Sequence, residues 1–332
     1  MELQTEEIGM LDLMPRPTFC VQNGGITRLN QEARKLFLRE GLSLRLLLES
    51  GDEDYAAFSG GLLYLTLTIH GQSFGASVAR IGQEDVFTLD QQFESEELRV
   101  LALAARELHL TPKAPTAGQL NRSLYQLLRI VGNMSDASGS SPAFRPENQN
   151  LTALFQEITE KVIALSEPVG VQISYTAPGE SWNCCIDRQL MERAVLNMIS
   201  NALKFTPKGG TVRLALHRSG KQFRFSVADD GLGLSEKEQA TLFSRYLREP
   251  TIEDSRHGIG LGMLLIRNTA ARHRGAVLVD HPQGNGTRVT ITFTSVPECR
   301  TGLQSKLLLA DYTGEQDHTL VELSEFLPPA FY

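Results

Sequence analysis

Residues 187–210 carry signals for both ends of one long helix. Asp187 is the type of side chain that caps a helix N-terminus, and residues 207–210 include the proline and glycines that stop a helix. Apolar residues recur in between at spacings of four, three and four, which predicts one buried stripe: Met191, Val195, Met198 and Ala202. A polar set recurs at spacings of four and three: Asn197, Asn201 and Lys204. Two amides and an ammonium group on one face could bind a metal-bound polyphosphate, although ordinary solvated surface has the same pattern.

Four further segments follow this helix in order. Residues 224–234 alternate apolar side chains as a strand does and run into the sequence Asp-Asp-Gly-Leu-Gly at 229–233. Residues 242–249 form a short amphipathic segment with two arginines. Residues 257–273 are a glycine-rich loop that leads into a helix, and residues 284–293 are a turn that feeds a strand. One glycine motif alone indicates only a turn, whereas four such segments in a fixed order form a specific pattern.

This ordered set resembles the ATP-binding domain of sensor histidine kinases, a group within the GHKL ATPases (the HATPase_c type) that also includes gyrase. The resemblance covers roughly residues 149–297 and implies a two-layer α/β sandwich of the Bergerat type with a mixed sheet. A Walker-type fold is excluded because the chain contains no GxxxxGK[ST] motif. The resemblance also implies ATP and Mg²⁺ as the ligands of this domain.

At the adenine end, the resemblance implies that Asp229 accepts a hydrogen bond from the amino group of the base. Gly231 and Gly233 would let the backbone turn tightly and approach the base, which a Cβ atom would hinder. Thr287 would form a hydrogen bond near the base. A tight turn is the structural alternative for the glycine pair, and Thr287 is also an ordinary strand former.

At the phosphate end, Asn201 matches the family residue that coordinates Mg²⁺, which in turn bridges phosphate oxygens. Lys204 would approach the phosphates as a point charge. A glycine box precedes a helix N-terminus, which favours anions, and comprises Gly258, Gly260 and Gly262. Arg245 and Arg248 are candidates for contact with the γ-phosphate, and surface salt bridges are the alternative for both.

Asn197 lies one helical turn before Asn201 and belongs to the predicted ATP-binding set. In the ATP-hydrolysing relatives such as gyrase, this position is a Glu that activates water. An amide cannot take up that proton, because it has no basic lone pair near neutral pH. The sequence therefore favours phosphotransfer or simple nucleotide binding over hydrolysis.

Residues 10–90 alternate short apolar runs with turn residues, which predicts an α+β domain over residues 1–92. A strand, a turn, a strand and a helix are expected over 17–37, then two strands joined by His70-Gly71 and a third within 85–91. The order resembles a small PAS-type sensor domain. Cys20 is interpreted as a core residue, and both a ligand sensor and a purely structural module remain open.

Residues 93–138 contain two amphipathic segments, 94–110 and 118–134, which resemble the dimerisation hairpin of histidine kinases. Two apolar stripes cannot both be buried within one hairpin, so a four-helix homodimer is expected. The usual phosphoacceptor motif, His-Glu-Leu-Arg-Thr-Pro, is altered here. His109 could still accept phosphate, with Glu107 as a nearby base, if the hairpin is locally re-registered; a helix-edge His without phosphate chemistry is the alternative.

Residues 139–148 are rich in Ser and Pro and are expected to be a linker. Residues 298–332 are an addition to the family core. They could hold an edge strand at 305–312 and a short helix within 315–327, with His318 on the surface. No chemistry is assigned to this tail.

Charge and composition limit the remaining classes. A net charge of −7 argues against nucleic-acid binding, since duplex binding requires a basic surface. The four cysteines show no metal-ligand spacing and are interpreted as reduced thiols: Cys20, Cys184, Cys185 and Cys299. No run approaches about 18 apolar residues, so no transmembrane segment is predicted. Without a signal-peptide pattern either, a cytoplasmic protein is expected.

Two functions of different classes follow for this multidomain α+β chain. The first is a sensor-histidine-kinase-like protein that phosphorylates a His and passes the group to an Asp on the receiver domain of a response regulator. The second is an ATP-binding pseudokinase whose nucleotide state changes the dimer and its partners. A Ser kinase of the anti-sigma type fits less well, because such proteins lack the long hairpin and the amino-terminal domain.

Overall fold

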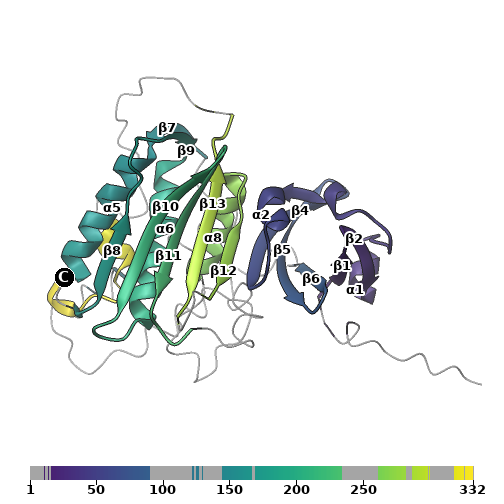
Figure 1. Ribbon diagram of the computed structural model, residues 1–332, viewed down its shortest axis with the longest axis horizontal. Helices are drawn as coiled ribbons and strands as arrows, with labels where there is room; N and C mark the ends of the chain where they lie inside the picture. Colours follow the sequence, from purple (N-terminus) through teal and green to yellow (C-terminus); the bar gives the residue numbers. More distant parts are fainter. Residues whose placement is uncertain are drawn as a thin grey trace, which may run out of the picture. The chain divides into compact units, whose positions relative to one another are not determined.

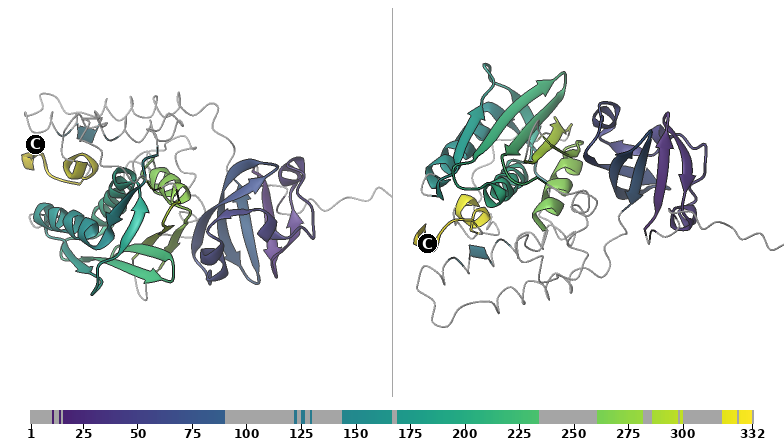
Figure 2. Two further views of the ribbon diagram at one scale, coloured as in Figure 1. Left: turned by 90° about the horizontal axis from the view of Figure 1, so that it is seen from above. Right: turned by 60° about the horizontal axis from the view of Figure 1, so that its bottom comes forward.

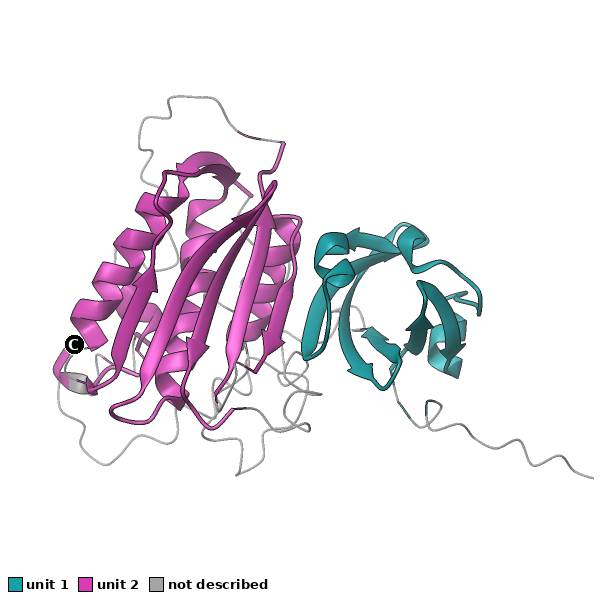
Figure 3. Ribbon diagram, in the orientation of Figure 1, with its two compact units in different colours: residues 1–92 teal, residues 93–332 magenta. Residues whose placement is uncertain are grey.

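The structure is a computed structural model, and Figure 1 shows its helices and strands. It describes residues 11, 14, 16–89, 122, 125, 126, 129, 144–166, 169–233, 261–281, 286–297, 299, 318–324 and 326–331. The chain forms two compact units, residues 1–92 and 93–332 (Figure 3). No helix within the described ranges is long and apolar enough to span a bilayer.

The first unit is an antiparallel sheet with two short helices between its strands. In chain order its elements are β1 (Thr18–Gln22), β2 (Gly25–Leu29), α1 (Gln31–Lys35), the 3₁₀ helix η2 (Leu44–Leu46), β3 (Leu48–Ser50), α2 (Asp52–Ala56), β4 (Leu62–Ile69), β5 (Gln72–Ile81) and β6 (Glu84–Leu89). The strands lie in the order β2-β1-β6-β5-β4, and β3 pairs with β4. This agrees with the strands expected from the sequence, whereas the PAS resemblance stays a prediction.

Two hairpins of this unit, β1–β2 and β4–β5, form where the sequence predicted them, because their turn residues accept a left-handed backbone. Asn23 and Gly24 have φ of 53° and 76° between β1 and β2, and His70 and Gly71 have φ of 50° and 79° between β4 and β5. Two-residue turns of this kind match the twist of the strands that they join. Cys20 is buried in β1, as expected for a core residue.

The second unit is a mixed sheet with helices packed on it. In chain order its elements are β7 (Glu147–Asn150), α5 (Leu151–Ser166), β8 (Gln172–Thr176), β9 (Asn183–Ile186), α6 (Arg188–Phe205), β10 (Thr211–Ser219), β11 (Gln222–Asp229), α8 (Leu261–Arg272), β12 (Val277–Asp280), β13 (Arg288–Thr294), α9 (His318–Glu322) and the 3₁₀ helix η6 (Pro329–Phe331). The sheet order is β12-β13-β11-β10-β8, in which only β8 and β10 run parallel. Helices α5, α6 and α8 lie together on one side of the sheet (Figure 2), so the predicted two-layer sandwich is confirmed.

Helix α6 begins and ends where the sequence predicted. The Asp187 carboxylate accepts a hydrogen bond from the backbone N–H of Leu190 (3.1 Å), and the helix ends before Pro207. The whole predicted apolar stripe of α6 is buried. Three polar residues of the same helix are buried as well: Arg193, Asn197 and Ser200. The helix is therefore covered by the sheet on one face and by other helices on further faces.

The end of the predicted linker belongs to the fold. Residues Glu147–Asn150 form β7, which pairs with β9 in a separate two-stranded sheet. Upstream of β7, the Arg145 N–H donates to the Asp187 carboxylate (2.8 Å), and the ring centroids of Phe144 and His273 are 5.2 Å apart. The Ser- and Pro-rich composition therefore does not indicate a linker from residue 144 onward. Residues 147–150 pair with β9, and the local sequence does not reveal this distant partner strand.

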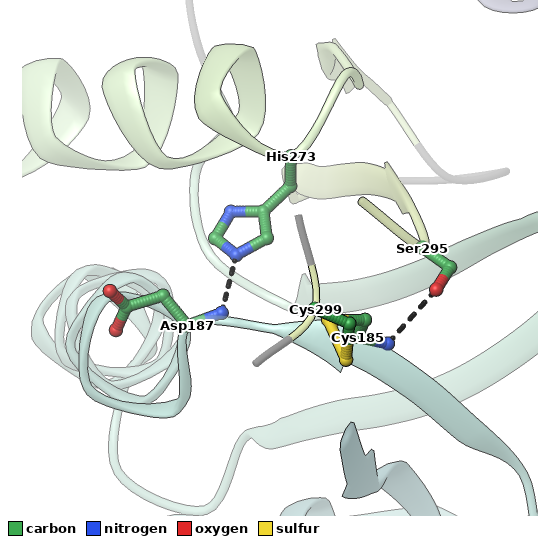
Figure 4. Close-up of a disulfide and its surroundings, with 5 residues drawn as sticks. All are labelled: Cys185, Asp187, His273, Ser295 and Cys299. Carbon is green, nitrogen blue, oxygen red and sulfur yellow. Dashed lines mark hydrogen bonds between the residues drawn. A yellow bond between two sulfur atoms is a disulfide. The ribbon is translucent and has the colours of Figure 1, made fainter. Parts of the chain in front are cut away.

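A disulfide joins Cys185 of β9 to Cys299, which corrects the interpretation of four reduced cysteines (Figure 4). The segment after β13 returns along β9, where the Cys185 N–H donates to Ser295 Oγ (3.1 Å) and the Val296 N–H donates to the Cys185 carbonyl (3.1 Å). This brings the Cα atoms of the two cysteines to 5.7 Å across 114 residues of sequence. Disulfides are uncommon in reducing compartments, and the cytoplasmic location stays a prediction.

Reduction of this disulfide is expected to lower the free energy of unfolding of the second unit by about 2–4 kcal/mol, since the bond closes a long loop in the unfolded chain. Urea unfolding with and without dithiothreitol measures the difference. A Cys299→Ser variant should show the same loss and no further response to the reductant. Equal stability of the wild type in both conditions would contradict the expectation.

His273, directly after α8, is fully buried and is held in one neutral form. Figure 4 shows its hydrogen bond with the Asp187 backbone. Its Nε2 accepts a hydrogen bond from the Asp187 N–H (2.9 Å), so the proton lies on Nδ1, which donates to the Thr269 carbonyl (2.7 Å). Burial holds the pKa of His273 below its ordinary value. Below a pH of about 6.5 the unfolded chain therefore binds more protons than the folded chain.

The free energy of unfolding is accordingly expected to fall as pH drops from about 7.5 to about 5.5, with a contribution from this one group of at most about 1.4 kcal/mol per pH unit. Urea titrations of the wild type and of His273→Gln at both pH values check this. The Gln side chain does not titrate, so the variant should lose less stability than the wild type over the same interval. An equal loss in both proteins would show that another group is responsible.

The end of the chain is a packed part of the second unit. Helix α9 confirms the short helix predicted within 315–327, and it packs against α5 and α6. Val321, Leu323 and Leu327 are fully buried. His318, which the sequence analysis placed on the surface, is only partly exposed. The predicted edge strand at 305–312 lies outside the described residues.

Candidate functional site

The structure describes eight of the residues predicted to form the nucleotide site, all in the second unit: Asn197, Asn201, Lys204, Asp229, Gly231, Gly233, Gly262 and Thr287. The remaining predicted residues lie outside the described ranges: Glu107, His109, Arg245, Arg248, Gly258 and Gly260. The described part of the predicted site therefore comprises α6, the end of β11, the start of α8 and the start of β13.

Asp229 is the last residue of β11, and its buried carboxylate is fixed through one oxygen. Oδ1 accepts hydrogen bonds from the N–H groups of Gly231 (2.8 Å) and Thr287 (3.2 Å). The Asp229 N–H in turn donates to the Thr287 carbonyl (2.9 Å). Oδ2 receives no hydrogen bond from the described residues. Two predicted site residues thus hold a third so that one carboxylate oxygen remains for a ligand donor.

Burial raises the pKa of Asp229 above its ordinary value, and the hydrogen bonds from Gly231 and Thr287 act in the opposite direction. A carboxylate whose charge is poorly solvated gains more from a hydrogen-bond donor than an exposed one does. A bound amino group at Oδ2 would therefore be favourable. The neighbouring Asp230 differs, because it pairs with Arg213 (2.8 Å) on the surface.

The turn after Asp229 touches the end of α6, and this contact requires glycine. A Cβ atom at Gly231 would lie 2.7 Å from the Phe205 carbonyl oxygen and 2.7 Å from Asp229 Oδ1. Gly233 has φ of 75°, which few other residues adopt at low cost. Gly231 is therefore needed for the close approach of this turn to α6, and Gly233 for its left-handed backbone.

The predicted polar face of α6 is divided. Asn201 and Lys204 are partly exposed, and the Lys204 ammonium lies 5.9 Å from the centroid of the Phe205 ring. Asn197 is fully buried. Its Nδ2 donates to the Arg193 carbonyl (3.0 Å) and to Glu322 Oε2 (2.7 Å), and its Oδ1 has no hydrogen-bond partner among the described residues. The three side chains do not form the common open face that their spacing predicted.

Asn197 instead contacts the glycine box. A Cβ atom at Gly262, in the first turn of α8, would lie 2.6 Å from Asn197 Oδ1. Glycine at this position lets α8 pack closely on α6. The N–H groups of a first helical turn have no partner within the helix, so the N-terminal end of a helix favours anions. Asn197 Oδ1 therefore lies at the end of α8 where the resemblance places the phosphates.

One helix thus connects both ends of the predicted site. Asn197 meets Gly262, and Phe205, about two turns or roughly 12 Å further along α6, meets Gly231. Asn201 and Lys204 lie between these two contacts. The adenine end and the phosphate end are consequently fixed relative to each other by the length of α6.

Sequence reasoning missed Glu322, which contacts Asn197 and is fully buried in α9. It lies among apolar residues in the run Leu320-Val321-Glu322-Leu323. A single carboxylate in such a run indicates a buried partner, because an unpaired buried charge is costly. That signal was present, but the sequence did not reveal which residue would pair with it.

A match to a known protein family lies within this unit. Residues 186–297 match the sequence profile of the family described as histidine kinase-, DNA gyrase B- and HSP90-like ATPase. The adaptive-response sensory kinase SasA of Prochlorococcus marinus is 28% identical over 219 residues, which are 60% of this chain and 57% of that protein. The histidine protein kinase DivJ of Caulobacter vibrioides is 35% identical over 126 residues, which are 38% of this chain and 21% of that protein.

Among solved structures, the mycobacterial sensor histidine kinase MprB aligns with 45% of this chain and 97% of its own, at 26% identity and a TM-score of 0.38. The chain spans little more than half the length of SasA and about a fifth of DivJ. Residues 186–297 belong to the histidine kinase-, DNA gyrase B- and HSP90-like ATPases, and the chain is a relative of the sensor histidine kinases.

Proposed function

We propose that this chain binds Mg·ATP between α6, the β11 turn and the start of α8, and transfers the γ-phosphoryl group to a His in two-component signalling. The observation that carries the proposal is Asp229. Its carboxylate is buried and anchored through Oδ1 by Gly231 and Thr287, while Oδ2 remains available to a donor such as the adenine amino group.

The other described residues have roles that fit this placement. Asn201 is a partly exposed amide one turn from Asn197, so its oxygen could ligate Mg²⁺, which prefers oxygen ligands. Lys204 would offset phosphate charge, and the first turn of α8 at Gly262 would accept the phosphates. Thr287 and Gly233 border the base. Four further residues are included in the proposed site because of the family resemblance alone: Arg245, Arg248, Gly258 and Gly260.

Phosphotransfer is favoured over hydrolysis because Asn197 cannot act as a general base. The carboxylate nearest to it among the described contacts, Glu322, accepts hydrogen bonds from Asn197 and from Arg193 Nε (3.2 Å), so it is already engaged on both oxygens. The phosphoryl group would pass to His109, with Glu107 as the base that takes up its proton.

The rest of the chain is proposed to serve this reaction. Residues 1–92 would form a PAS-like sensor domain, and residues 93–138 would form the hairpin of a homodimer. The proposed partner is the receiver domain of a response regulator, and the proposed location is the cytoplasm. The support for these assignments is the sequence pattern and the relation to sensor histidine kinases.

Incubation with γ-labelled ATP and Mg²⁺ tests the reaction. The expected result is a label that is acid-labile and base-stable, that is lost in His109→Gln and that persists in His217→Gln, a control at an exposed position of β10. Transfer of the label to a receiver domain would identify the partner class. No label, with ATP binding intact by calorimetry, would contradict the kinase and favour an ATP-binding pseudokinase.

A further inference from the structure

Glu322 of α9 is a fully buried carboxylate on which side chains from two other helices converge. Arg193 of α6, only 3% exposed, donates from Nε to Oε1 (3.2 Å), and Asn197 of the same helix donates to Oε2 (2.7 Å). Arg129, in the helix predicted at 118–134, places its Nε 3.7 Å from Oε2. A buried carboxylate is tolerated only with such partners, so the cluster fixes the position of Glu322.

The C-terminal segment, defined here as residues 318–324, also contacts the helix that carries Arg129. The Ser324 carbonyl accepts hydrogen bonds from Arg122 Nε (3.0 Å) and from Gln126 Nε2 (3.3 Å). Residues 122, 126 and 129 recur at spacings of four and three, so they share one face of that helix. The C-terminal segment therefore contacts this helix and α6 at once.

Glu322 determines which way the Asn197 amide faces. Both N–H groups of Nδ2 are used, one by the Arg193 carbonyl and one by Glu322. The reversed amide would place its oxygen against a carbonyl and a carboxylate, which is repulsive. Oδ1 is consequently directed to α8, at the position where a Cβ of Gly262 would be 2.6 Å away.

Oδ1 is a buried acceptor without a partner among the described residues. Leaving such an acceptor unpaired costs about 1–3 kcal/mol, which a ligand that brings a donor or a cation would recover. The acceptor lies at the start of α8, at the phosphate end of the site. The orientation of Asn197 Oδ1 therefore favours binding of the phosphate end of the nucleotide, which brings Mg²⁺ or water. It does not affect the adenine end.

We propose that Glu322 is a positioning residue of the nucleotide site: it holds the Asn197 amide so that Oδ1 faces the phosphate end, and it acts only through Asn197. This inference rests on the proposed binding of Mg·ATP and adds a residue from outside the matched ATPase domain. The C-terminal segment then contributes to the affinity for the phosphates of a nucleotide and not to the affinity for the nucleoside.

The test uses calorimetry on the full chain with two ligands, Mg²⁺ with a non-hydrolysable imido analogue of ATP, and adenosine. Glu322→Ala is expected to weaken binding of the analogue about tenfold, while adenosine, which lacks phosphates, binds as it does to the wild type. A general loss of structure would weaken both ligands together. In the Asn197→Ala background, Glu322→Ala should cause no further loss, since its effect passes through that amide.

Glu157→Ala is the matched control, because Glu157 is also a carboxylate with two cationic partners, Arg188 (2.8 Å) and Lys161 (3.2 Å), but lies on the surface of α5. It should leave both affinities unchanged. If Glu322→Ala does not fold, Glu322→Gln gives the same test with a smaller expected loss, as its amide oxygen still accepts from Asn197.

Three outcomes would overturn the inference: unchanged affinity for the analogue, equal losses for analogue and adenosine, or additive effects of the two alanine substitutions. Binding of neither ligand by the wild type would be a different failure, because it would refute the proposed function itself.

Discussion

Asp229→Asn is expected to lower the affinity of the chain for ATP by about a hundredfold, or about 2.7 kcal/mol. Asn can keep the two hydrogen bonds that Oδ1 accepts from Gly231 and Thr287, so the turn should stay folded. The change falls on the second oxygen, which becomes an NH₂ group. That group would face the adenine amino group as donor against donor, and a hydrogen bond to a charged acceptor, about 1.5–3 kcal/mol, would be lost.

Calorimetric titration with ATP, together with a thermal melt to confirm folding, measures this effect. Asp230→Asn is the control, since it makes the same chemical change one residue along. Asp230 pairs with Arg213, whose side chain is 54% exposed, and such surface pairs contribute little. Wild-type affinity in Asp229→Asn would show that the adenine assignment is wrong. Equal losses in both variants would show that net charge, and not the position of the carboxylate, determines binding.

Gly275→Ala is expected to destabilise the second unit by about 3 kcal/mol or more. Gly275 lies between α8 and β12, where a Cβ atom would be 1.8 Å from the Thr292 carbonyl oxygen. Thr292 belongs to β13, which is paired on both sides, with β11 and with β12. Relief of the clash would therefore require the movement of a central strand and the loss of its ladder hydrogen bonds.

Urea unfolding of the purified chain checks this expectation. The matched substitution is Gly179→Ala, because Gly179 lies between β8 and β9 with no heavy atom within 4 Å of its Cβ position. That variant should remain within about 0.5 kcal/mol of the wild type. A Gly275→Ala protein as stable as Gly179→Ala would mean that the approach of Gly275 to β13 is looser than the structure shows.

The sequence predicted those features that depend on neighbouring residues. The cap at Asp187, the turns at Asn23-Gly24 and His70-Gly71, and the strand end at Asp229 are each specified within a few positions, because caps and turns use local hydrogen bonds and local φ preferences. The spacing of the apolar stripe of α6 was sufficient to predict which of its residues are buried, because that spacing is also a local property of the helix. The order of the glycine boxes then identified the ATPase domain, which the matched profile confirms.

Helical spacing could not predict the environment of Asn197. Residues 197, 201 and 204 share a face of α6, yet only the first is fully buried, because α8 and α9 contact the helix at that residue. Periodicity indicates which residues lie on one side of a helix. It does not indicate how far a neighbouring helix extends along that side.

The sequence by itself determined helix α6, the two predicted turns of the first unit and the order of the nucleotide-binding motifs, since these depend on residues a few positions apart. Only the tertiary structure decided the partners of Glu322, the pairing of Cys185 with Cys299 and the recruitment of β7 to β9. Each of these joins residues far apart in the chain. Such contacts form only when a particular packing brings two surfaces together, and many alternative packings are compatible with the same local pattern.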